Sequence, residues 1–153
     1  MAHTVTFIPY TLEHQDACLT LFDENCPEFF APNERDDYRG FLDQQYDGYC
    51  VCELESKVVG AFGLLQQDDG SHAINWILLS PTAQGIGLGK QIMAQVVQTA
   101  QDKGVNEISI AASHLSAPFF AKFAAKVIKE TPNGWGKGMH RVDMVLSVDT
   151  QSD

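Results

Sequence analysis

One stretch of the chain, from residue 74 to residue 104, joins an apolar run, a proline, a glycine-rich loop and an amphipathic segment in that order. The apolar run ends at Ser80-Pro81, a pattern typical of a buried strand that proline terminates. After the loop, apolar side chains recur at helical spacing up to Lys103-Gly104, which forms a helix stop. The loop glycines therefore lie where a strand gives way to the N-terminus of a helix.

A helix N-terminus preceded by glycines favours the binding of a phosphate group. The first backbone N–H groups of the helix have no intrahelical partner, and the helix dipole is positive at this end. Gly85, Gly87 and Gly89 carry no side chains that would keep a pyrophosphate away from these amides. The sequence therefore predicts a pyrophosphate site at this junction.

The spacing of the glycines excludes two common nucleotide-binding loops. The dinucleotide-binding fingerprint is G-x-G-x-x-G with an acidic residue near the end of the next strand. Here the pattern is G-x-G-x-G, and the strand expected over 107–112 runs on into Ser113 without a carboxylate. The phosphate loop of nucleotide hydrolases needs four residues between its glycines and a hydroxyl after its lysine. Gly85 and Gly89 enclose three residues, and Lys90 is followed by a glutamine.

A third loop pattern fits the chain. The pattern (Arg/Gln)-x-x-Gly-x-Gly occurs as Gln84-x-x-Gly87-x-Gly89, directly after the strand and its proline. This resembles the pyrophosphate-binding motif of the GNAT superfamily of acyl-CoA N-acyltransferases. The resemblance implies acetyl-CoA as co-substrate, no metal, and acetyl transfer by direct attack of a primary amine on a small molecule or peptide. It also implies that the pyrophosphate is bound by seven consecutive residues, Gln84, Gly85, Ile86, Gly87, Leu88, Gly89 and Lys90.

The order of the predicted elements supports the same resemblance. At 153 residues the chain has the length of one domain with a full hydrophobic core, so we expect a single domain over 1–153. Strands are expected over 4–9, 48–55, 57–67, 72–79, 107–112, 127–131 and 139–148, and helices over 12–23, 33–46, 88–103 and 116–126. A turn is expected at Pro132-Asn133-Gly134. This is the order of the GNAT fold, an α/β (α+β) domain with a mixed, mostly antiparallel sheet of about seven strands flanked by four helices.

Charge and composition exclude several kinds of partner. The formal charge of −10 argues against nucleic-acid or anionic-membrane partners, which require a basic surface. A negative protein should also repel coenzyme A, which is a polyanion. Salt screens charges beyond about 8 Å, however, so groups near the loop, such as Lys90, determine whether coenzyme A binds. The first residues lack a signal-peptide pattern and no apolar run reaches membrane-spanning length, so we expect a cytoplasmic protein.

The four cysteines, Cys18, Cys26, Cys50 and Cys52, lack the spacing of metal ligands. Cys50 and Cys52 lie two apart on an expected strand, so both thiols point to one face. In a cytoplasmic chain we expect free core thiols, with a redox or zinc role as the alternative.

The resemblance also implies roles for residues beside the thioester. In the GNAT family the strands on either side of the loop helix splay apart, and the pantetheine arm would lie between them along Ile77 and Leu79. The backbone N–H of Leu79 would donate to the thioester carbonyl, where charge grows in the transition state. Phe120 would contact the cofactor where many relatives have a tyrosine that protonates the departing thiolate. Ser113 would bind the cofactor and relay that proton through water, or else cap the following helix.

A base must deprotonate an alkylammonium before it attacks, and two histidines are candidates, His72 and His114. Three aromatic residues are candidates for the acceptor pocket: Phe30, Tyr38 and Trp135. Aromatic residues at helical spacing are equally typical of a hydrophobic core. The sequence does not indicate which amine is the acceptor, and a homodimer is among the open oligomeric states.

Two other functions stay open on the sequence alone. Phe120 favours a non-catalytic acyl-CoA-binding sensor or interaction module, because it replaces the usual proton donor. A nucleotide-binding regulator would also use a glycine-rich helix N-terminus. Since a fold does not fix a function, the geometry of the site has to distinguish these alternatives.

Overall fold

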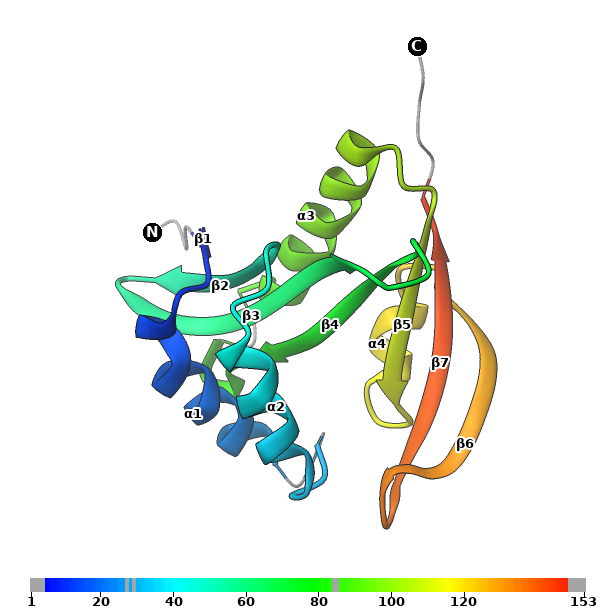
Figure 1. Cartoon of the computed structure of the whole chain (residues 1–153), viewed down its shortest axis with the longest axis horizontal. Helices are drawn as coiled ribbons and strands as arrows, with labels where there is room; N and C mark the ends of the chain where they lie inside the picture. Colours follow the sequence, from blue (N-terminus) through cyan, green and yellow to red (C-terminus); the bar gives the residue numbers. More distant parts are fainter. Residues whose placement is uncertain (1–4, 27, 29, 84–85, 149–153) are drawn as a thin grey trace.

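The computed structural model describes residues 5–26, 28, 30–83 and 86–148. Its seven-stranded sheet consists of β1 (Thr6–Pro9), β2 (Tyr49–Leu54), β3 (Lys57–Gln66), β4 (His72–Leu79), β5 (Glu107–Ser113), β6 (Lys126–Gly136) and β7 (Met139–Ser147). The α-helices of the described part are α1 (Gln15–Asn25), α2 (Glu34–Asp43), α3 (Leu88–Lys103) and α4 (Ala117–Ala121). Two short 3-10 helices, η1 (Leu12–His14) and η2 (Pro81–Ala83), complete the order of elements. The predicted fold class is confirmed (Figure 1).

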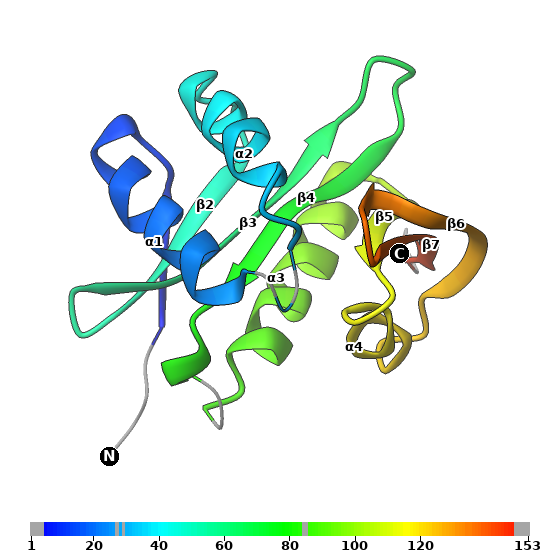
Figure 2. The same ribbon diagram turned by 90° about the horizontal axis from the view of Figure 1, so that it is seen from below.

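The strands lie in the order β1-β2-β3-β4-β5-β7-β6. Neighbouring strands are antiparallel except for β4 and β5, which are parallel. A parallel pair needs a crossover connection, and α3 supplies it. Figure 2 shows α1 and α2 on one face of the sheet and α3 and α4 on the other. Among the described helices, none is long and apolar enough to cross a membrane.

Each face of the sheet has its own hydrophobic core. The apolar stripe of α3, which includes Ile92, Met93 and Val96, packs on one face. Phe22 of α1 and Tyr38 of α2 pack on the other face. Because successive strand residues point to opposite faces, each central strand contributes side chains to both cores.

Strand β4 changes face in its middle because it contains a β-bulge. Asn75 and Leu78 are three positions apart, but their partners on β3 are only two apart, so β4 carries one extra residue. Trp76, inside the bulge, has a φ of +44°, which is uncommon for a bulky residue. The extra residue reverses the alternation of the strand. Ile74 therefore lies in the α3 core and Leu78 in the α1–α2 core.

The Tyr49 side chain of β2 holds this bulge. Its ring crosses β3 at Gly63, where an added Cβ would lie 2.7 Å from the Tyr49 Cδ1 atom. Its hydroxyl donates to the Trp76 carbonyl at 2.5 Å and lies 2.8 Å from the Tyr38 hydroxyl. Burial raises the pKa of Tyr49 well above its usual value, so the phenol keeps the proton that it donates. Glycine at position 63 is required for this approach.

The last helix is shorter than predicted. The sequence pattern predicts a helix over 116–126, but α4 ends at Ala121. The chain leaves the helix through Ala124, whose φ of +73° is left-handed, and β6 begins at Lys126. Pairing of β6 with β7 thus competes with the helix for these residues and prevails.

The predicted turn at Pro132-Asn133-Gly134 is wrong. β6 continues to Gly136, and the hairpin turns at Lys137-Gly138, where Gly138 has a φ of +80°. Asn133 does adopt a turn-like φ of +53°, but the strand absorbs it as an irregularity in its pairing with β7.

The cysteines are free thiols, as predicted. Burial raises the pKa of Cys18 to about 11 and that of Cys52 to about 12. Both thiols therefore stay protonated at neutral pH and act as small apolar residues of the cores. No group of three or more His, Cys, Asp or Glu within the described residues could hold a metal ion.

We expect Tyr49→Phe to lower the free energy of unfolding by about 1–3 kcal/mol, because the Trp76 carbonyl and the Tyr38 hydroxyl would lose their shared partner inside the fold. Tyr46→Phe is the control, since Tyr46 is 48% exposed. Surface substitutions usually change stability by less than about 0.5 kcal/mol. Urea unfolding of both variants measures the difference. Equal stability would show that the Tyr49 hydroxyl does not hold the bulge.

Candidate functional site

Strands β4 and β5 pair over only a few residues and then diverge, as Figure 1 shows. Residues 72–74 are in register with residues 108–110, and the register ends there. A cleft of about 1280 Å³ opens in the gap and is lined by residues from both faces of the sheet. The splayed strand pair that the family resemblance implies is therefore present.

Backbone groups of both strands point into this cleft. The Ser80 amide donates to β3, so by the alternation of an antiparallel ladder the N–H and C=O of Leu79 point away from β3. The His114 amide donates to β7, so the backbone groups of Ala111 point away from β7. Leu79 and Ala111 both line the cleft. A ligand in the cleft therefore meets two strand edges.

The Leu79 backbone is fixed by Asn25, the last residue of α1. The Asn25 side-chain amide donates to the carbonyl of Leu79 at 2.9 Å and to that of Leu21 at 2.8 Å. Asn25 is buried and lines the cleft. Because these two bonds join helix to strand, the orientation of the Leu79 backbone is set before any ligand binds.

The start of α3 forms one end of the cleft. Gly87 has a φ of +76°, a left-handed conformation that glycine adopts without strain, and its carbonyl accepts a hydrogen bond from the Gln91 amide. An added Cβ on Gly89 would lie 2.7 Å from the Phe119 ring. The two glycines thus leave part of the first turn of α3 without side chains, and at Gly89 this turn packs closely against α4.

Of the seven loop residues named by the motif, four line the cleft: Gly87, Leu88, Gly89 and Lys90. Ile86 packs against the α3 core and is not among the lining residues. Gln84 and Gly85 lie outside the described residues. Of the five motif residues that the structure describes, all except Ile86 therefore line the cleft.

The cleft is far less acidic than the chain as a whole. Its charged residues are Lys90, Lys122, Lys129, Arg141, Glu34, Asp69 and Asp143. Cations thus balance carboxylates locally, although the whole chain carries −10. Since charges beyond about 8 Å are largely screened at physiological salt, a polyanion at the start of α3 is not repelled by the distant surface.

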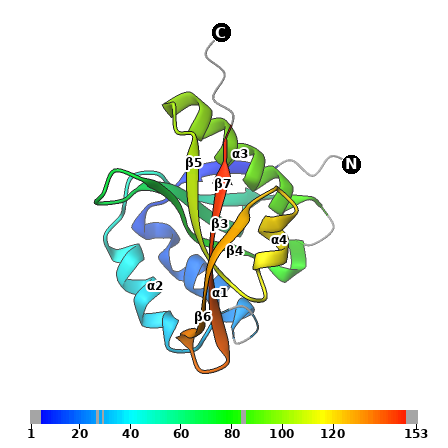
Figure 3. The same cartoon turned by 90° about the vertical axis from the view of Figure 1, so that its right-hand side faces the viewer.

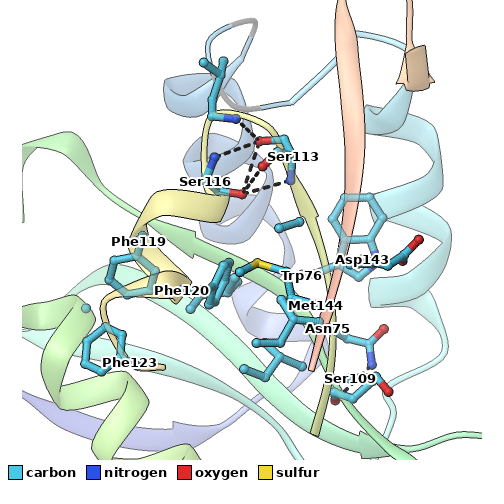
Figure 4. Close-up of a pocket in the computed structure, with 18 of the residues that line it drawn as sticks. Asn75, Trp76, Ser109, Ser113, Ser116, Phe119, Phe120, Phe123, Asp143 and Met144 are labelled. Carbon is cyan, nitrogen blue, oxygen red and sulfur yellow. Dashed lines mark hydrogen bonds between the residues drawn. The ribbon is translucent and has the colours of Figure 1, made fainter. Parts of the chain in front are cut away.

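Phe120 and Ser113 line the cleft from α4 and β5 (Figure 4). Phe120 is buried in the α3 core. The Ser113 hydroxyl accepts from the amides of Leu115 and Ser116 at 3.2 and 3.1 Å. These bonds shape the turn that leads into α4. This structural role is similar to helix capping, which the sequence indicates as the alternative to a proton relay. A proton relay through Ser113 stays a prediction.

Aromatic residues line the opposite end, beside α1 and α2. Phe30 stacks on Trp76 with ring centroids 6.0 Å apart, and both line the cleft. Trp135 lines it from β6. Its indole donates to the Ala112 carbonyl at 2.9 Å, and the Arg141 guanidinium lies 4.8 Å above its ring. Phe30 and Trp135 therefore line the cleft, and their contact with an acceptor stays a prediction.

Three other predicted residues, Tyr38, His72 and His114, are not among those that line the cleft. Tyr38 is fully buried and stacks behind Trp76 at a centroid distance of 4.8 Å. His72 lies where β4 still pairs with β5. The His114 ring accepts from the amide of His140 at 3.2 Å. Their roles in acceptor binding and base catalysis stay predictions, and their positions do not support them.

Sequence reasoning missed Asn25 and Glu34, two buried polar residues of the cleft. Asn25 falls on the apolar face of α1 together with Leu21 and Phe22. A polar residue at such a position indicates a specific hydrogen-bond partner, so this signal was available. Glu34 follows the expected cap Asn33, where an acidic residue simply favours the helix dipole. The sequence alone gives it no other meaning.

The cleft suits a ligand with an amide-bearing arm and a diphosphate. Exposed strand edges bind amides in the manner of an added strand, and a glycine-lined helix N-terminus binds phosphate. Its volume of about 1280 Å³ exceeds the roughly 300–1,000 Å³ of a usual ligand pocket, so a second molecule has room beside the first.

The model of the acetyltransferase (GNAT) family matches residues 17–124, whereas no curated protein matches the chain. The ribosomal-protein-S18-alanine N-acetyltransferase of Escherichia coli is 13% identical with a TM-score of 0.77, covering 98% of this chain and 97% of that one. The protein yncA of Salmonella typhimurium, solved with its cofactor acetyl-CoA, is 14% identical with a TM-score of 0.72, covering 98% and 97%. An N-acetyltransferase of Staphylococcus aureus Mu50 is 15% identical with a TM-score of 0.72, covering 95% and 99%. Since the family model matches more than half of this chain, the chain belongs to the GNAT family of acetyltransferases.

Proposed function

We propose that this protein is an N-acetyltransferase that moves the acetyl group of acetyl-CoA to a primary amine of a small molecule or peptide. The observation that carries the proposal is the cleft between β4 and β5, which connects the N-terminus of α3 with the backbone of Leu79. Membership of the GNAT family supports acetyl transfer, and the acetyl-CoA in the related Salmonella typhimurium structure supports the co-substrate.

Two parts of the cleft would hold acetyl-CoA. The first amides of α3, cleared by Gly87 and Gly89, would bind the pyrophosphate, and Lys90 would add its charge. The pantetheine arm would lie along the edge of β4 near Ile77 and Leu79, like a short extra strand. When bound, acetyl-CoA supplies an activated acyl group that an amine can attack directly.

The Leu79 N–H would stabilise the thioester oxygen as negative charge develops on it. Loss of one such donor typically costs about 2.7–4 kcal/mol of transition-state stabilisation. A donor contributes most when its orientation is fixed in advance. Asn25 provides this by holding the carbonyl of the same residue, so we assign it a positioning role.

A non-catalytic acyl-CoA-binding sensor or interaction module is the second candidate. Phe120 favours it, because this ring has no proton for the departing thiolate. The absence of this proton donor removes only part of the assistance to catalysis, however. A thiol has a pKa near 8.5, so coenzyme A leaves as thiolate with less help than an alkoxide needs.

Release of free thiol from acetyl-CoA in the presence of a panel of primary amines tests the proposal. We expect release that depends on the presence of at least one amine. Tight acetyl-CoA binding without release for any amine would instead support the binding module. Tighter binding of ATP than of coenzyme A in calorimetry would point to a nucleotide-binding regulator.

We expect Gly87→Ala to weaken acetyl-CoA binding about tenfold or more, equivalent to roughly 1.4 kcal/mol. The added Cβ would occupy open space at the start of α3, on the cleft side. Gly104→Ala is the matched control. Gly104 has a φ of +70° and equally open surroundings, but it lies at the opposite end of the same helix. Both variants carry a similar backbone strain of about 1–2 kcal/mol. Calorimetry measures Kd for acetyl-CoA, and a Kd that rises equally in both variants, or in neither, would contradict this site.

We expect Phe120→Tyr to raise kcat by up to about 10²-fold, the lower end of the roughly 10²–10⁴ that a general acid contributes. The new hydroxyl would stand in the position from which relatives protonate the sulfur. Phe123→Tyr is the control, since Phe123 lines the same wall of the cleft. Steady-state kcat at saturating acetyl-CoA measures both. A gain no larger than that of the control would mean that the ring at position 120 does not reach the sulfur.

A further inference from the structure

Apart from tyrosine hydroxyls and cysteine thiols, four polar or charged side chains of the described residues are buried, and all four line the cleft: Asn25, Glu34, Ser80 and Ser113. Glu34 alone among them is ionisable at physiological pH, and it is only 5% exposed. Its Oε2 atom accepts from the Ala31 amide at 2.8 Å. The ion pairs within the described part of the chain join Arg35 to Asp23 and Arg141 to Asp143, so they do not include Glu34. A buried carboxylate without a cationic partner therefore faces a ligand cleft.

Glu34 lies at the end of the cleft where acetyl transfer would occur. It is the first residue of α2, and its charge acts on the thiol of Cys26, the residue that follows Asn25. Asn25 in turn contacts the Leu79 carbonyl. The carboxylate is thus linked to the Leu79 backbone through Cys26 and Asn25, and Glu34, Leu79 and Trp76 all line the cleft.

The β6–β7 hairpin closes this region from the outside. The Asn33 side chain donates to the carbonyl of Trp135 at 3.0 Å. An added Cβ on Gly136 would lie 2.9 Å from the Cβ of Ala31. Figure 3 shows the tip of the hairpin beside the segment that joins α1 to α2. The hairpin thus contacts both Ala31, whose amide bonds to Glu34, and Asn33, the residue before Glu34.

Burial raises the pKa of the Glu34 carboxyl above its usual value, the Ala31 amide acts in the opposite direction, and Asp37 raises it further. A base works best when its pKa lies near the operating pH, so this shift suits proton transfer. The titratable groups close to it are Asp37 on its own helix and Cys26 after α1. The other charged residues that line the cleft are Asp69, Lys90, Lys122, Lys129, Arg141 and Asp143.

We propose that Glu34 is the catalytic residue that binds the ammonium group of the acceptor and takes its proton, so that the acceptors are protonated primary alkylamines. The inference rests on the proposed acetyl transfer. An ammonium would supply the positive partner that the buried carboxylate lacks. The faces of Phe30 and Trp76, which line the same end, also attract cations.

The protons balance in this scheme. Glu34 takes one proton from R–NH₃⁺, and the lone pair of the resulting amine forms the C–N bond at the thioester carbonyl. The C–S bond breaks as the carbonyl reforms, and its electron pair leaves on sulfur. The second amine proton passes to the sulfur, so the products are the amide and the thiol of coenzyme A. Glu34 then returns its proton to water.

Glu34→Gln tests the proposal with 2-phenylethylamine as the probe, because glutamine keeps the shape and can still accept from Ala31. We expect kcat/KM to fall about 10²-fold or more, the usual contribution of a general base. Aniline is the internal control, since this arylamine is already neutral and needs no base before it attacks. Glu24→Gln, at an exposed position near the end of α1, is the control variant and should change neither substrate. Equal losses for 2-phenylethylamine and aniline would reduce Glu34 to a structural role and overturn the proposal.

The pH profile provides a second readout. The carboxylate is the active form, so wild-type kcat/KM for 2-phenylethylamine should rise as pH rises through the Glu34 pKa. In Glu34→Gln this limb should disappear, and the rate should instead follow the fraction of free amine up to the pKa of 2-phenylethylamine itself. An unchanged limb in the variant would assign the titration to another group and overturn the proposal.

A binding arm separates this inference from the proposed function. If the wild-type protein releases no thiol with any amine, the proposal of acetyl transfer is wrong. Calorimetry of 2-phenylethylammonium with the coenzyme A-loaded protein then tests whether Glu34 binds an ammonium group. Binding that weakens at least tenfold in Glu34→Gln would still support an ammonium site at Glu34. Equal binding by both proteins, or none by either, would overturn it.

Discussion

The hydrogen bond from the Tyr49 hydroxyl to the Trp76 carbonyl is the contact on which the site depends most. It holds a bulge in β4 that begins directly after the last residue in register with β5. A bulge bends and twists its strand, so β4 leaves β5 at this point. The glycine at position 63 is part of the same arrangement, because only a residue without a Cβ lets the Tyr49 ring cross β3.

Because β4 diverges from β5, residues from both faces of the sheet line one cleft. On the α3–α4 side, glycines and lysines line the end proposed to bind the pyrophosphate. On the α1–α2 side, aromatic rings and a buried carboxylate line the end proposed to bind an ammonium group. The two sites meet at Leu79, whose backbone Asn25 holds. In the proposed reaction, opposite charges at the two ends would orient the two ligands toward one point, which a cleft on a single face would not do.

Much of the fold was predictable, because it rests on local patterns. The strand–proline–glycine–helix junction predicted β4 with its observed bounds and the start of α3. The pairing that ends α4 early and carries β6 past Pro132 depends on β7, which comes later in the chain. The bulge at Trp76 also looks like uninterrupted strand in the sequence, since the Tyr49 contact that holds it is distant.

The candidate site was likewise predictable only where it depends on a local sequence pattern. The cofactor end follows a short contiguous motif, and four of its residues line the cleft as expected. The acceptor end is assembled from separate segments. Asn25 and Leu79 are 54 positions apart, and neither residue type identifies the other as its partner. His72 and His114 were named from their side-chain chemistry and from their places at strand ends, whereas the buried carboxylate that lines the cleft is Glu34.

Proton transfers at the two ends of the reaction differ in cost, and the difference bears on both Glu34 and Phe120. An alkylammonium with a pKa near 10.4 requires about 4.6 kcal/mol to lose its proton at pH 7. A thiol with a pKa near 8.5 requires only about 2 kcal/mol to exist as thiolate at the same pH. A missing base is therefore the larger obstacle, and a missing acid the smaller one. This asymmetry makes a phenylalanine at position 120 compatible with catalysis, provided that a carboxylate such as Glu34 takes the proton of the amine.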